Sequence, residues 1–152
     1  MRNWRVCIVA VFALFWATGS AWANGALGTW ATEGGKSHVT ITACEDKLCG
    51  TIIWLKEPLT EAGEPKHDAN NPDDALKTRP IIGLPLLAGF VPGEEDNVWE
   101  NGTIYNPEDG ELYSCVLTLL DAGTLKVRGF VGLPLFVKRK FGSKYNNVGR
   151  FV

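Results

Sequence analysis

Apolar and polar residues alternate with a period of two in several short stretches of the chain. In residues 38–43 and 125–128 every second residue is apolar. A third stretch places four side chains on a single face: Tyr113, Cys115, Leu117 and Leu119. Such alternation predicts strands that bury one face. Residues 49–56 are apolar on both faces, which predicts a strand that is covered on both sides or lines a cavity.

Turn-forming residues separate these stretches at the spacing of hairpins. They lie at Gly34–Gly35, Cys44–Cys49, Asn106–Gly110 and Asp121–Gly123. Glycine accepts a positive φ there, and Asp or Asn bonds its own backbone. No segment has the pattern of a long amphipathic helix. The sequence therefore predicts an all-β domain, either a small barrel or a sandwich.

Residues 57–80 break this pattern, because they are rich in Pro, Asp, Asn and Lys. A loop of this length within a compact domain is usually functional or mobile. The segment that follows, Ile81–Phe90, is strongly apolar but contains two glycines and Pro85. Proline argues against both a central strand and an uninterrupted helix. We expect a short helical or irregular segment, packed across one end of the sheet as a core plug or as the rim of a site.

The first 23 residues have the pattern of a cleavable secretory signal. Arg2 and Arg5 precede the apolar residues 6–16, and the small residues of Ala21–Ala23 stand where a signal peptidase recognises its substrate. An uncleaved anchor is the alternative, but about 20 apolar residues are needed to span a bilayer. We expect cleavage between Ala23 and Asn24, no remaining transmembrane segment, and a single domain over residues 24–152 in the periplasm or outside the cell.

The charge of the chain argues against one class of partner. The full sequence has 15 basic and 17 acidic residues, and cleavage would remove Arg2 and Arg5. A net negative mature chain is not typical of general nucleic-acid binding. The residues from Pro80 to Leu125 include acids but no Lys or Arg, whereas Lys126–Val152 includes bases only. We expect such halves to lie side by side in a sheet and to neutralise one another.

Three cysteines remain after cleavage. Cys44 and Cys49 flank a four-residue loop, which sets two residues of a hairpin opposite each other and favours a disulfide in an oxidising compartment. A zinc site is the alternative, but no second cysteine pair completes four ligands. Cys115 lies in an apolar stretch, so we expect a buried thiol rather than a nucleophile.

Several sequence runs, taken in order, resemble one bacterial family. The runs are Gly28–Trp30, Cys44–Trp54, Asp68–Asp73, Arg79–Leu84 and Ile104–Tyr113. Together they are similar to the exported proteins known as domain of unknown function 2147 (DUF2147), over about Leu27 to Leu135. The resemblance implies a lipocalin-like (calycin) fold, a small antiparallel up-and-down β-barrel.

The Gly-x-Trp run at Gly28–Trp30 is also similar to the lipocalin signature. In that signature the tryptophan closes the barrel floor beneath a basic residue of the last strand, which implies Trp30 stacked with Arg139. The family pattern ends with a tryptophan followed by a basic residue, and this chain has no such pair after Leu135. We expect residues 142–152 to form a frayed tail.

The sequence indicates no catalytic, metal or cofactor site. His38 and His67 are not next to a serine or cysteine in a nucleophile motif, so a hydrolase with a Cys115–His pair is a distant alternative. Calcium at Asp68, Asn70 and Asp73 would lack the glycine and distal glutamate of a calcium loop.

The leading hypothesis is a non-enzymatic, extracytoplasmic binding protein for a small hydrophobic or amphiphilic molecule. The candidate ligand-binding residues are Trp54, Arg79, Trp99, Tyr105 and Tyr113. Rings would cover an apolar body and Arg79 would meet an acidic head, with residues 57–90 as a lid or rim. For Trp54 and Tyr113 a place in the core is an equal alternative. A further alternative is an envelope interaction module that presents Ile81–Phe90 to a protein or a membrane surface.

Overall fold

Strands make up nearly all of the regular structure. The structure is a computed structural model and describes residues 25–130, 137–140 and 148–151. The strands are β1 (Gly28–Ala31), β2 (Ser37–Cys44), β3 (Lys47–Leu55), β4 (Pro85–Pro92), β5 (Val98–Asn106), β6 (Glu111–Asp121), β7 (Thr124–Phe130), β8 (Val137–Lys140) and β9 (Val148–Phe151). Two short 3-10 helices, η1 (Glu33–Gly35) and η2 (Asp74–Leu76), lie in loops. The predicted all-β class is confirmed.

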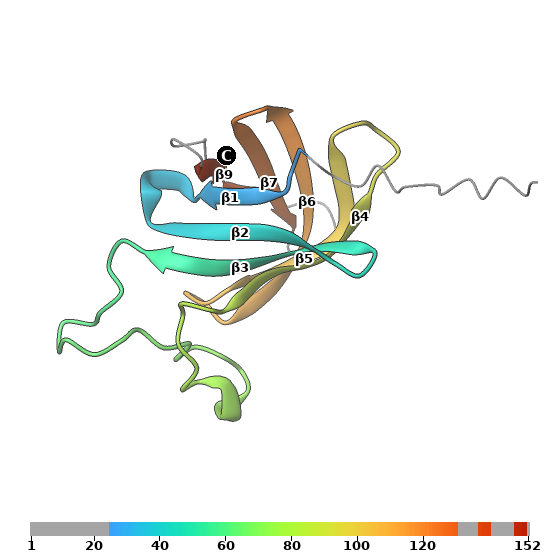
Figure 1. Cartoon of the computed structure of the whole chain (residues 1–152). Helices are drawn as coiled ribbons and strands as arrows, with labels where there is room; N and C mark the ends of the chain where they lie inside the picture. The colour runs from blue at the N-terminus through green and yellow to red at the C-terminus, as the bar shows by residue number, and fades with distance from the viewer. Residues whose placement is uncertain (1–24, 131–136, 141–147, 152) are drawn as a thin grey trace, which may run out of the picture.

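The first seven strands form an up-and-down sheet that curls into a half-barrel (Figure 1). Each of β1 to β7 pairs antiparallel with the next strand along the chain. Strand β9 pairs parallel with both β1 and β7, and β8 pairs antiparallel with β7. The pairing therefore continues from β7 through β9 to β1, which covers the backbone groups of both outer strands.

The alternation seen in the sequence sets which side chains enter the barrel. Trp30 of β1, Val39 of β2 and Ile52 of β3 are partners in register, and all three are buried. Leu117 of β6 and Val127 of β7 form a second buried pair. Because a strand points every second side chain to the same face, the alternation by itself places these residues inside the barrel. The strands predicted over residues 38–43, 113–119 and 125–128 are confirmed.

Side chains fill the interior that these strands enclose. The largest fully buried ones are Trp30, Phe90, Ile41, Leu84, Leu87, Leu117, Leu125 and Val39. Gly102 of β5 lies beneath Phe90, and a Cβ at this glycine would overlap the Phe90 ring. The Phe90 ring therefore occupies the space that a side chain at position 102 would need.

The segment Ile81–Phe90 differs from our expectation. Residues Pro85–Pro92 form strand β4, which lies between β3 and β5 and is neither helical nor a cap on the sheet. Pro85 is tolerated because it is the first residue of the strand. The buried side chains recur every third position, at Ile81, Leu84, Leu87 and Phe90, and the β3–β4 register shifts twice along this stretch. These irregularities obscure the period of two.

Two expectations concern the ends of the chain. Residues 1–23, including the expected cleavage site, lie outside the described residues. In the expected tail, Val148–Phe151 forms β9 and is paired on both sides, whereas 142–147 and 152 also lie outside the described residues. Among the residues described, no helix has the length and apolar character needed to cross a membrane.

We predict that Gly102→Ala destabilises the protein by about 1–3 kcal/mol, because the new methyl group must displace the Phe90 ring within a packed core. Gly129→Ala in β7 is the matched control. Its Cβ would have no described neighbour closer than 3.7 Å, and we expect a change below about 0.5 kcal/mol. Urea unfolding followed by tryptophan fluorescence measures both variants. Equal stability of the two would show that Phe90 has room to move.

Candidate functional site

The long segment between β3 and β4 folds back on itself and forms an ordered layer at one end of the barrel. The Lys66 backbone N–H donates to the Pro58 carbonyl at 2.9 Å, and the Ile81 N–H donates to the Lys66 carbonyl at 3.0 Å. Three stretches of the segment therefore run side by side. We call this end of the barrel, which also includes the β5–β6 turn, the loop end (Figure 1).

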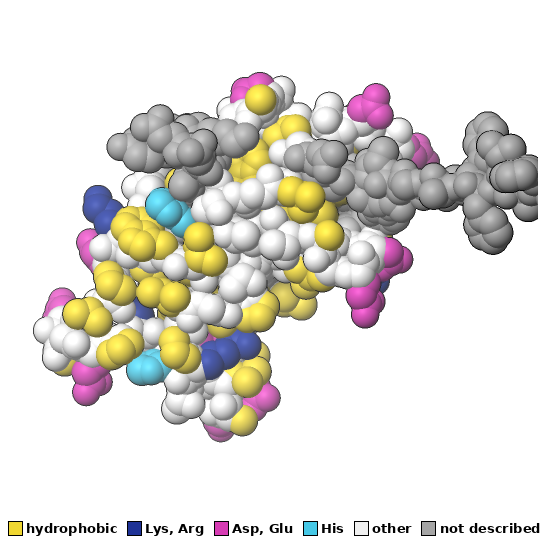
Figure 2. Space-filling view, in the orientation of Figure 1, with side chains coloured by type: hydrophobic (Ala, Val, Ile, Leu, Met, Phe, Trp, Pro, Cys, Tyr) yellow, Lys and Arg dark blue, Asp and Glu magenta, His cyan; other side chains and the backbone are white. Residues whose placement is uncertain are grey.

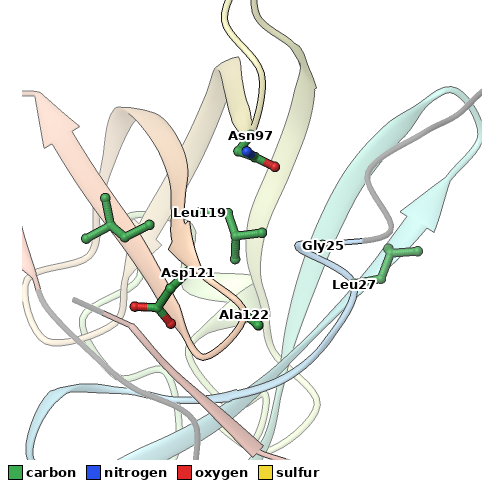
Figure 3. Close-up of a pocket in the computed structure, with 7 residues that line it drawn as sticks. Gly25, Leu27, Asn97, Leu119, Asp121 and Ala122 are labelled. Atoms are coloured by element: carbon green, nitrogen blue, oxygen red, sulfur yellow. The ribbon is translucent and has the colours of Figure 1, made fainter.

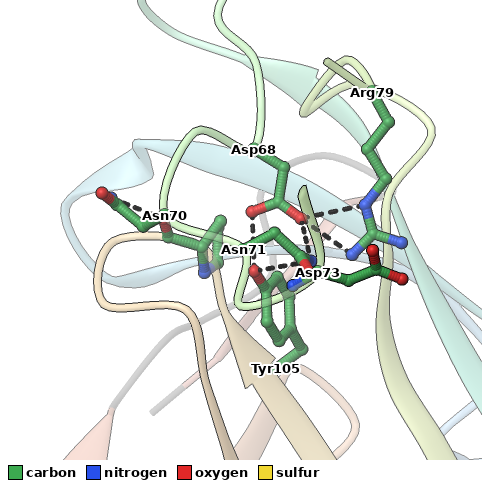
Figure 4. Close-up of polar contacts among 7 residues, drawn as sticks. Asp68, Asn70, Asn71, Asp73, Arg79 and Tyr105 are labelled. Carbon is green, nitrogen blue, oxygen red and sulfur yellow. Dashed lines mark hydrogen bonds and ion pairs between the residues drawn. The ribbon is translucent and has the colours of Figure 1, made fainter. Parts of the chain in front are cut away.

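A buried carboxylate joins this segment to the barrel wall (Figure 4). Asp68 is fully buried, and its Oδ1 accepts a hydrogen bond of 2.7 Å from the hydroxyl of Tyr105 on β5. Its Oδ2 accepts from Asn71 Nδ2 at 2.8 Å and from Arg79 Nε at 2.9 Å, and Arg79 Nη2 lies 2.8 Å away. The guanidinium also lies over the Tyr105 ring, 5.5 Å from its centroid. We call these four residues the Asp68 clamp.

The electrostatics of the clamp favour the ionised carboxylate. Burial by itself would raise the pKa of Asp68, but the hydrogen bonds from Tyr105, Asn71 and Arg79 and the positive charge of Arg79 lower it overall. Burial raises the pKa of Tyr105, and its hydrogen bond to Asp68 raises it further. Among the described residues no buried side-chain nitrogen or oxygen lacks a hydrogen-bond partner. The positive charge of Arg79 is thus neutralised by the Asp68 carboxylate within the protein.

A second set of contacts fixes the β5–β6 turn against the same segment. Asn70 Nδ2 donates to the carbonyls of Pro107 and Glu108 at 3.2 and 3.1 Å. Gly110 has a φ of 73°, and a Cβ there would overlap the Asn70 carbonyl oxygen. Glycine is therefore required at this position on two grounds. The Tyr113 hydroxyl donates to Asp109 at 2.7 Å in this turn.

The structure places the five candidate ligand-binding residues in different parts of the molecule. Arg79 and Tyr105 come together in the Asp68 clamp. Trp99 is buried in the core, and Tyr113 bonds to the β5–β6 turn. Trp54 is 41% exposed on the outside of the sheet, where its ring lies 4.4 Å from that of His38.

Of the two residues expected to close the barrel floor, only Trp30 has its side chain in the described part of the structure. Trp30 is fully buried, and its Nε1 donates to the Ala26 carbonyl at 2.8 Å. Arg139 lies in β8 opposite Arg128, but its side chain is outside the described part of the structure. Stacking of Arg139 on Trp30 therefore stays a prediction.

The cysteines behave as their spacing predicts. Cys44 and Cys49 form a disulfide across the β2–β3 hairpin, with their Cα atoms 5.9 Å apart. The disulfide prediction is confirmed, and it leaves no free thiolate in this pair for zinc. Cys115 is a buried free thiol whose pKa is raised to about 12 by burial. A thiol of this acidity is not ionised near neutral pH.

The donor groups considered for calcium are engaged elsewhere. The Asp68 carboxylate is held in the clamp, and Asn70 bonds to the β5–β6 turn. The Asp73 side chain accepts from the backbone N–H of Ala75 and caps η2. These three side chains therefore do not converge on one point.

Hydrophobic side chains are exposed mainly at the loop end. In the described part of the chain, five of the seven large exposed ones lie at the end of β3 or in the segment before β4: Ile53, Trp54, Leu59, Leu76 and Ile82. Figure 2 shows hydrophobic side chains gathered over this region. Within Ile81–Phe90, in contrast, the side chains of Ile81, Leu84, Leu87 and Phe90 are buried, so an interaction surface made of this segment would present only its exposed residues, such as Ile82.

A hollow of about 430 Å³ opens at the opposite end of the barrel (Figure 3). It lies between the start of the described chain, the β4–β5 loop and the β6–β7 hairpin, and we call this the hollow end. Its lining residues are Gly25, Leu27, Asn97, Leu119, Leu120, Asp121 and Ala122. The Leu119 backbone N–H donates to the Asn97 carbonyl at 2.8 Å, which ties the loop to the hairpin.

The lining of this hollow is apolar on its walls and polar at two points. Leu27, Leu119 and Leu120 supply the apolar surface, and Leu120 is 54% exposed. Asp121 Oδ1 accepts from the Gly123 N–H at 2.7 Å and so holds the hairpin turn. A second hollow of similar volume is lined by residues of β5 and β6 next to Cys115, where a register shift interrupts the pairing of these strands. None of the five candidate residues lines either hollow.

Comparison with known proteins places the chain in a family. The family model described as "Uncharacterized protein conserved in bacteria (DUF2147)" matches residues 28–141. The chain belongs to this family. A search of curated proteins finds no match for this DUF2147 protein.

One solved structure shares the fold of this DUF2147 chain. Protein HP1028 from Helicobacter pylori, which is described as belonging to the lipocalin family, is 19% identical. The match has a TM-score of 0.62 and covers 73% of each chain. At this identity the comparison shows the fold alone, and it confirms the lipocalin-like architecture that the resemblance implied.

Local sequence patterns do not indicate the residues of the hollow. Asp121–Gly123 has only the pattern of a turn, and no pattern marks Leu27 or Asn97 as part of a site. One signal was present: Leu119 and Leu120 are consecutive leucines before the turn, so one of them must face outward from a two-period strand. The hollow is formed by three segments that are far apart in the sequence, so no local sequence pattern predicts it.

The clamp makes stability depend on pH in a defined direction. Since the pKa of Asp68 is lowered in the folded state, its contribution to stability is complete above the unfolded pKa of about 4 and is lost as pH falls through the folded value. We predict that Asp68→Asn destabilises the protein by about 2–4 kcal/mol at pH 7, because Arg79 loses its partner. Urea unfolding at a series of pH values should show this difference shrinking below about pH 4.

Asp74→Asn is the control for this measurement. Asp74 lies in the same segment, but its ion pair with Lys77 is exposed to solvent. We expect a change below about 1 kcal/mol, since exposed pairs contribute little. A difference between wild type and Asp68→Asn that stays constant down to pH 2.5 would contradict an ionised Asp68.

Proposed function

We propose that this protein binds a small hydrophobic or amphiphilic molecule, without catalysis, outside the cytoplasm. The observation that carries the proposal is the hollow of about 430 Å³ at the hollow end, with leucine walls and polar groups at its edge. This volume lies within the range of small-molecule sites, which are often found at the mouths of β-barrels. Barrels of about eight strands are either filled by their own side chains or hold one small ligand, and here the room for a ligand is at the end of a filled barrel.

The packing of the barrel supports a site at one of its ends. Bulky side chains such as Trp30, Phe90 and Leu117 occupy the interior, so the ligand is held at the end of the barrel rather than at its centre. The long segment 57–84 lies at the loop end, on the other side of the core. The residues proposed to contact the ligand are therefore Leu27, Leu119, Leu120, Asn97 and Asp121.

The chemistry of the remaining groups supports a non-enzymatic role. The Cys115 thiol is buried with a pKa of about 12, and its Sγ contacts the Val116 carbonyl at 3.8 Å. His38 is stacked on Trp54 outside the sheet. A nucleophile needs an adjacent base or a lowered pKa, and Cys115 has a raised one.

We predict that Leu120→Asp weakens binding about tenfold or more, because it places a charge in the apolar wall of the hollow and removes leucine surface from the contact. Leu112→Asp is a matched control. It changes another exposed leucine of β6 that does not line the hollow. Titration with the neutral fluorescent probe N-phenylnaphthylamine measures both variants. Equal affinity, or no probe binding to the wild type, would refute the proposed site.

Export is supported by the signal pattern of residues 1–23 and by the Cys44–Cys49 disulfide, since disulfides persist in oxidising compartments. We predict that protein released from a bacterial host by osmotic shock begins at Asn24 and is oxidised at Cys44 and Cys49. Intact-mass spectrometry with and without reduction measures both features. A variant with Ala21→Asp and Ala23→Asp should accumulate as the uncleaved precursor. Recovery of wild-type protein that retains residues 1–23 would contradict the assignment.

A further inference from the structure

The geometry points to a ligand with a positively charged head and an apolar body. This inference rests on the proposed function and specifies its ligand class. It differs from our expectation from the sequence, in which Arg79 meets an acidic head, because Arg79 is paired with Asp68 at the loop end.

The hollow itself offers a cation two kinds of contact. Leu27, Leu119 and Leu120 provide apolar surface for an alkyl or aromatic body. Asp121 provides the charge: its Oδ1 is bonded to the Gly123 N–H, and among the described residues its Oδ2 has no protein partner. Among the described residues that line the hollow there is no Lys or Arg, so these residues offer no counter-charge to an anionic head.

The surrounding turns reinforce this charge. The β2–β3 hairpin lies at the same end of the up-and-down sheet as the β4–β5 loop and the β6–β7 hairpin. The exposed acids described there are Glu45, Asp46, Glu94, Glu95, Asp96 and Asp121, and Lys47 is the one base in these turns. On the face shown in Figure 2, acidic side chains lie along the upper and right margins, over these turns.

The loop end also carries exposed acids outside any ion pair of the described residues, among them Glu61, Glu64 and Glu108, but it differs in that the bases of its long segment are paired with acids. The ion pairs of the described residues all lie there: Lys66–Glu57, Lys77–Asp74 and Arg79–Asp68. Unpaired charges of one sign around a low-dielectric hollow add to a field that concentrates counter-ions. A cationic amphiphile is thus attracted to the hollow end, and an anionic one is repelled.

The experiment compares two amphiphiles of equal chain length, an alkyltrimethylammonium and an alkyl sulfate, both below their critical micelle concentrations. Each competes with the neutral probe N-phenylnaphthylamine for the mature protein at low salt. We expect the cation to bind about tenfold more tightly, and the ratio to shrink at high salt. Asp121→Asn should reduce the ratio about threefold, since the asparagine Oδ1 keeps the turn bond but removes the charge.

Glu61→Gln is the matched control for that variant. It removes one exposed acid at the loop end, and we expect the cation-to-anion ratio of the wild type. Equal binding of the two amphiphiles, or tighter binding of the sulfate, would overturn the inference about charge while leaving the site in place. Failure of the neutral probe to bind would instead overturn the proposed function. Because the wild-type ratio decides the question, the result does not depend on the folding of either variant.

Discussion

The buried carboxylate of Asp68 determines how the long segment is held against the barrel. A carboxylate removed from water is costly unless it is paired and hydrogen-bonded. Tyr105 comes from the barrel wall and Arg79 from the far end of the segment, and both bond to this one group. The segment cannot leave the barrel without breaking these bonds. A stretch whose composition is typical of a mobile loop is therefore fixed in one position.

The ion pairs of the described residues lie at one end of the molecule, although both ends carry exposed acids. At the loop end, Arg79 and Lys77 are neutralised by acids of the same segment. At the hollow end, the short turns carry consecutive acids, Glu45–Asp46 and Glu94–Asp96, with Lys47 as the one described base. The packed core separates the two ends, so a molecule at one end does not contact the side chains of the other. The chemistry available to a ligand thus depends on which end it meets.

Local sequence patterns predicted the local features of the fold and failed for those that depend on distant residues. The strands over 38–43 and 125–128 and the Cys44–Cys49 disulfide follow from neighbours in the chain. Strand β4 was missed because register shifts give its buried residues a spacing of three. The bond between Asp68 and Tyr105 spans 37 positions, and no period or spacing signals it. Aromatic residues were assigned to a site, although Trp99 serves the core.

The residue runs that link the chain to DUF2147 meet mainly in the clamp and its adjoining turn. Asp68 and Asn71 come from one run, Arg79 from a second and Tyr105 from a third. The hollow is lined instead by Gly25, Leu27, Asn97 and Leu119–Ala122, all of which lie outside those runs. Asn97 and Leu119–Ala122 nevertheless lie within residues 28–141, which the family model matches. Because a shared fold does not imply a shared ligand, the charge and shape of the hollow in each member must be argued from its own residues.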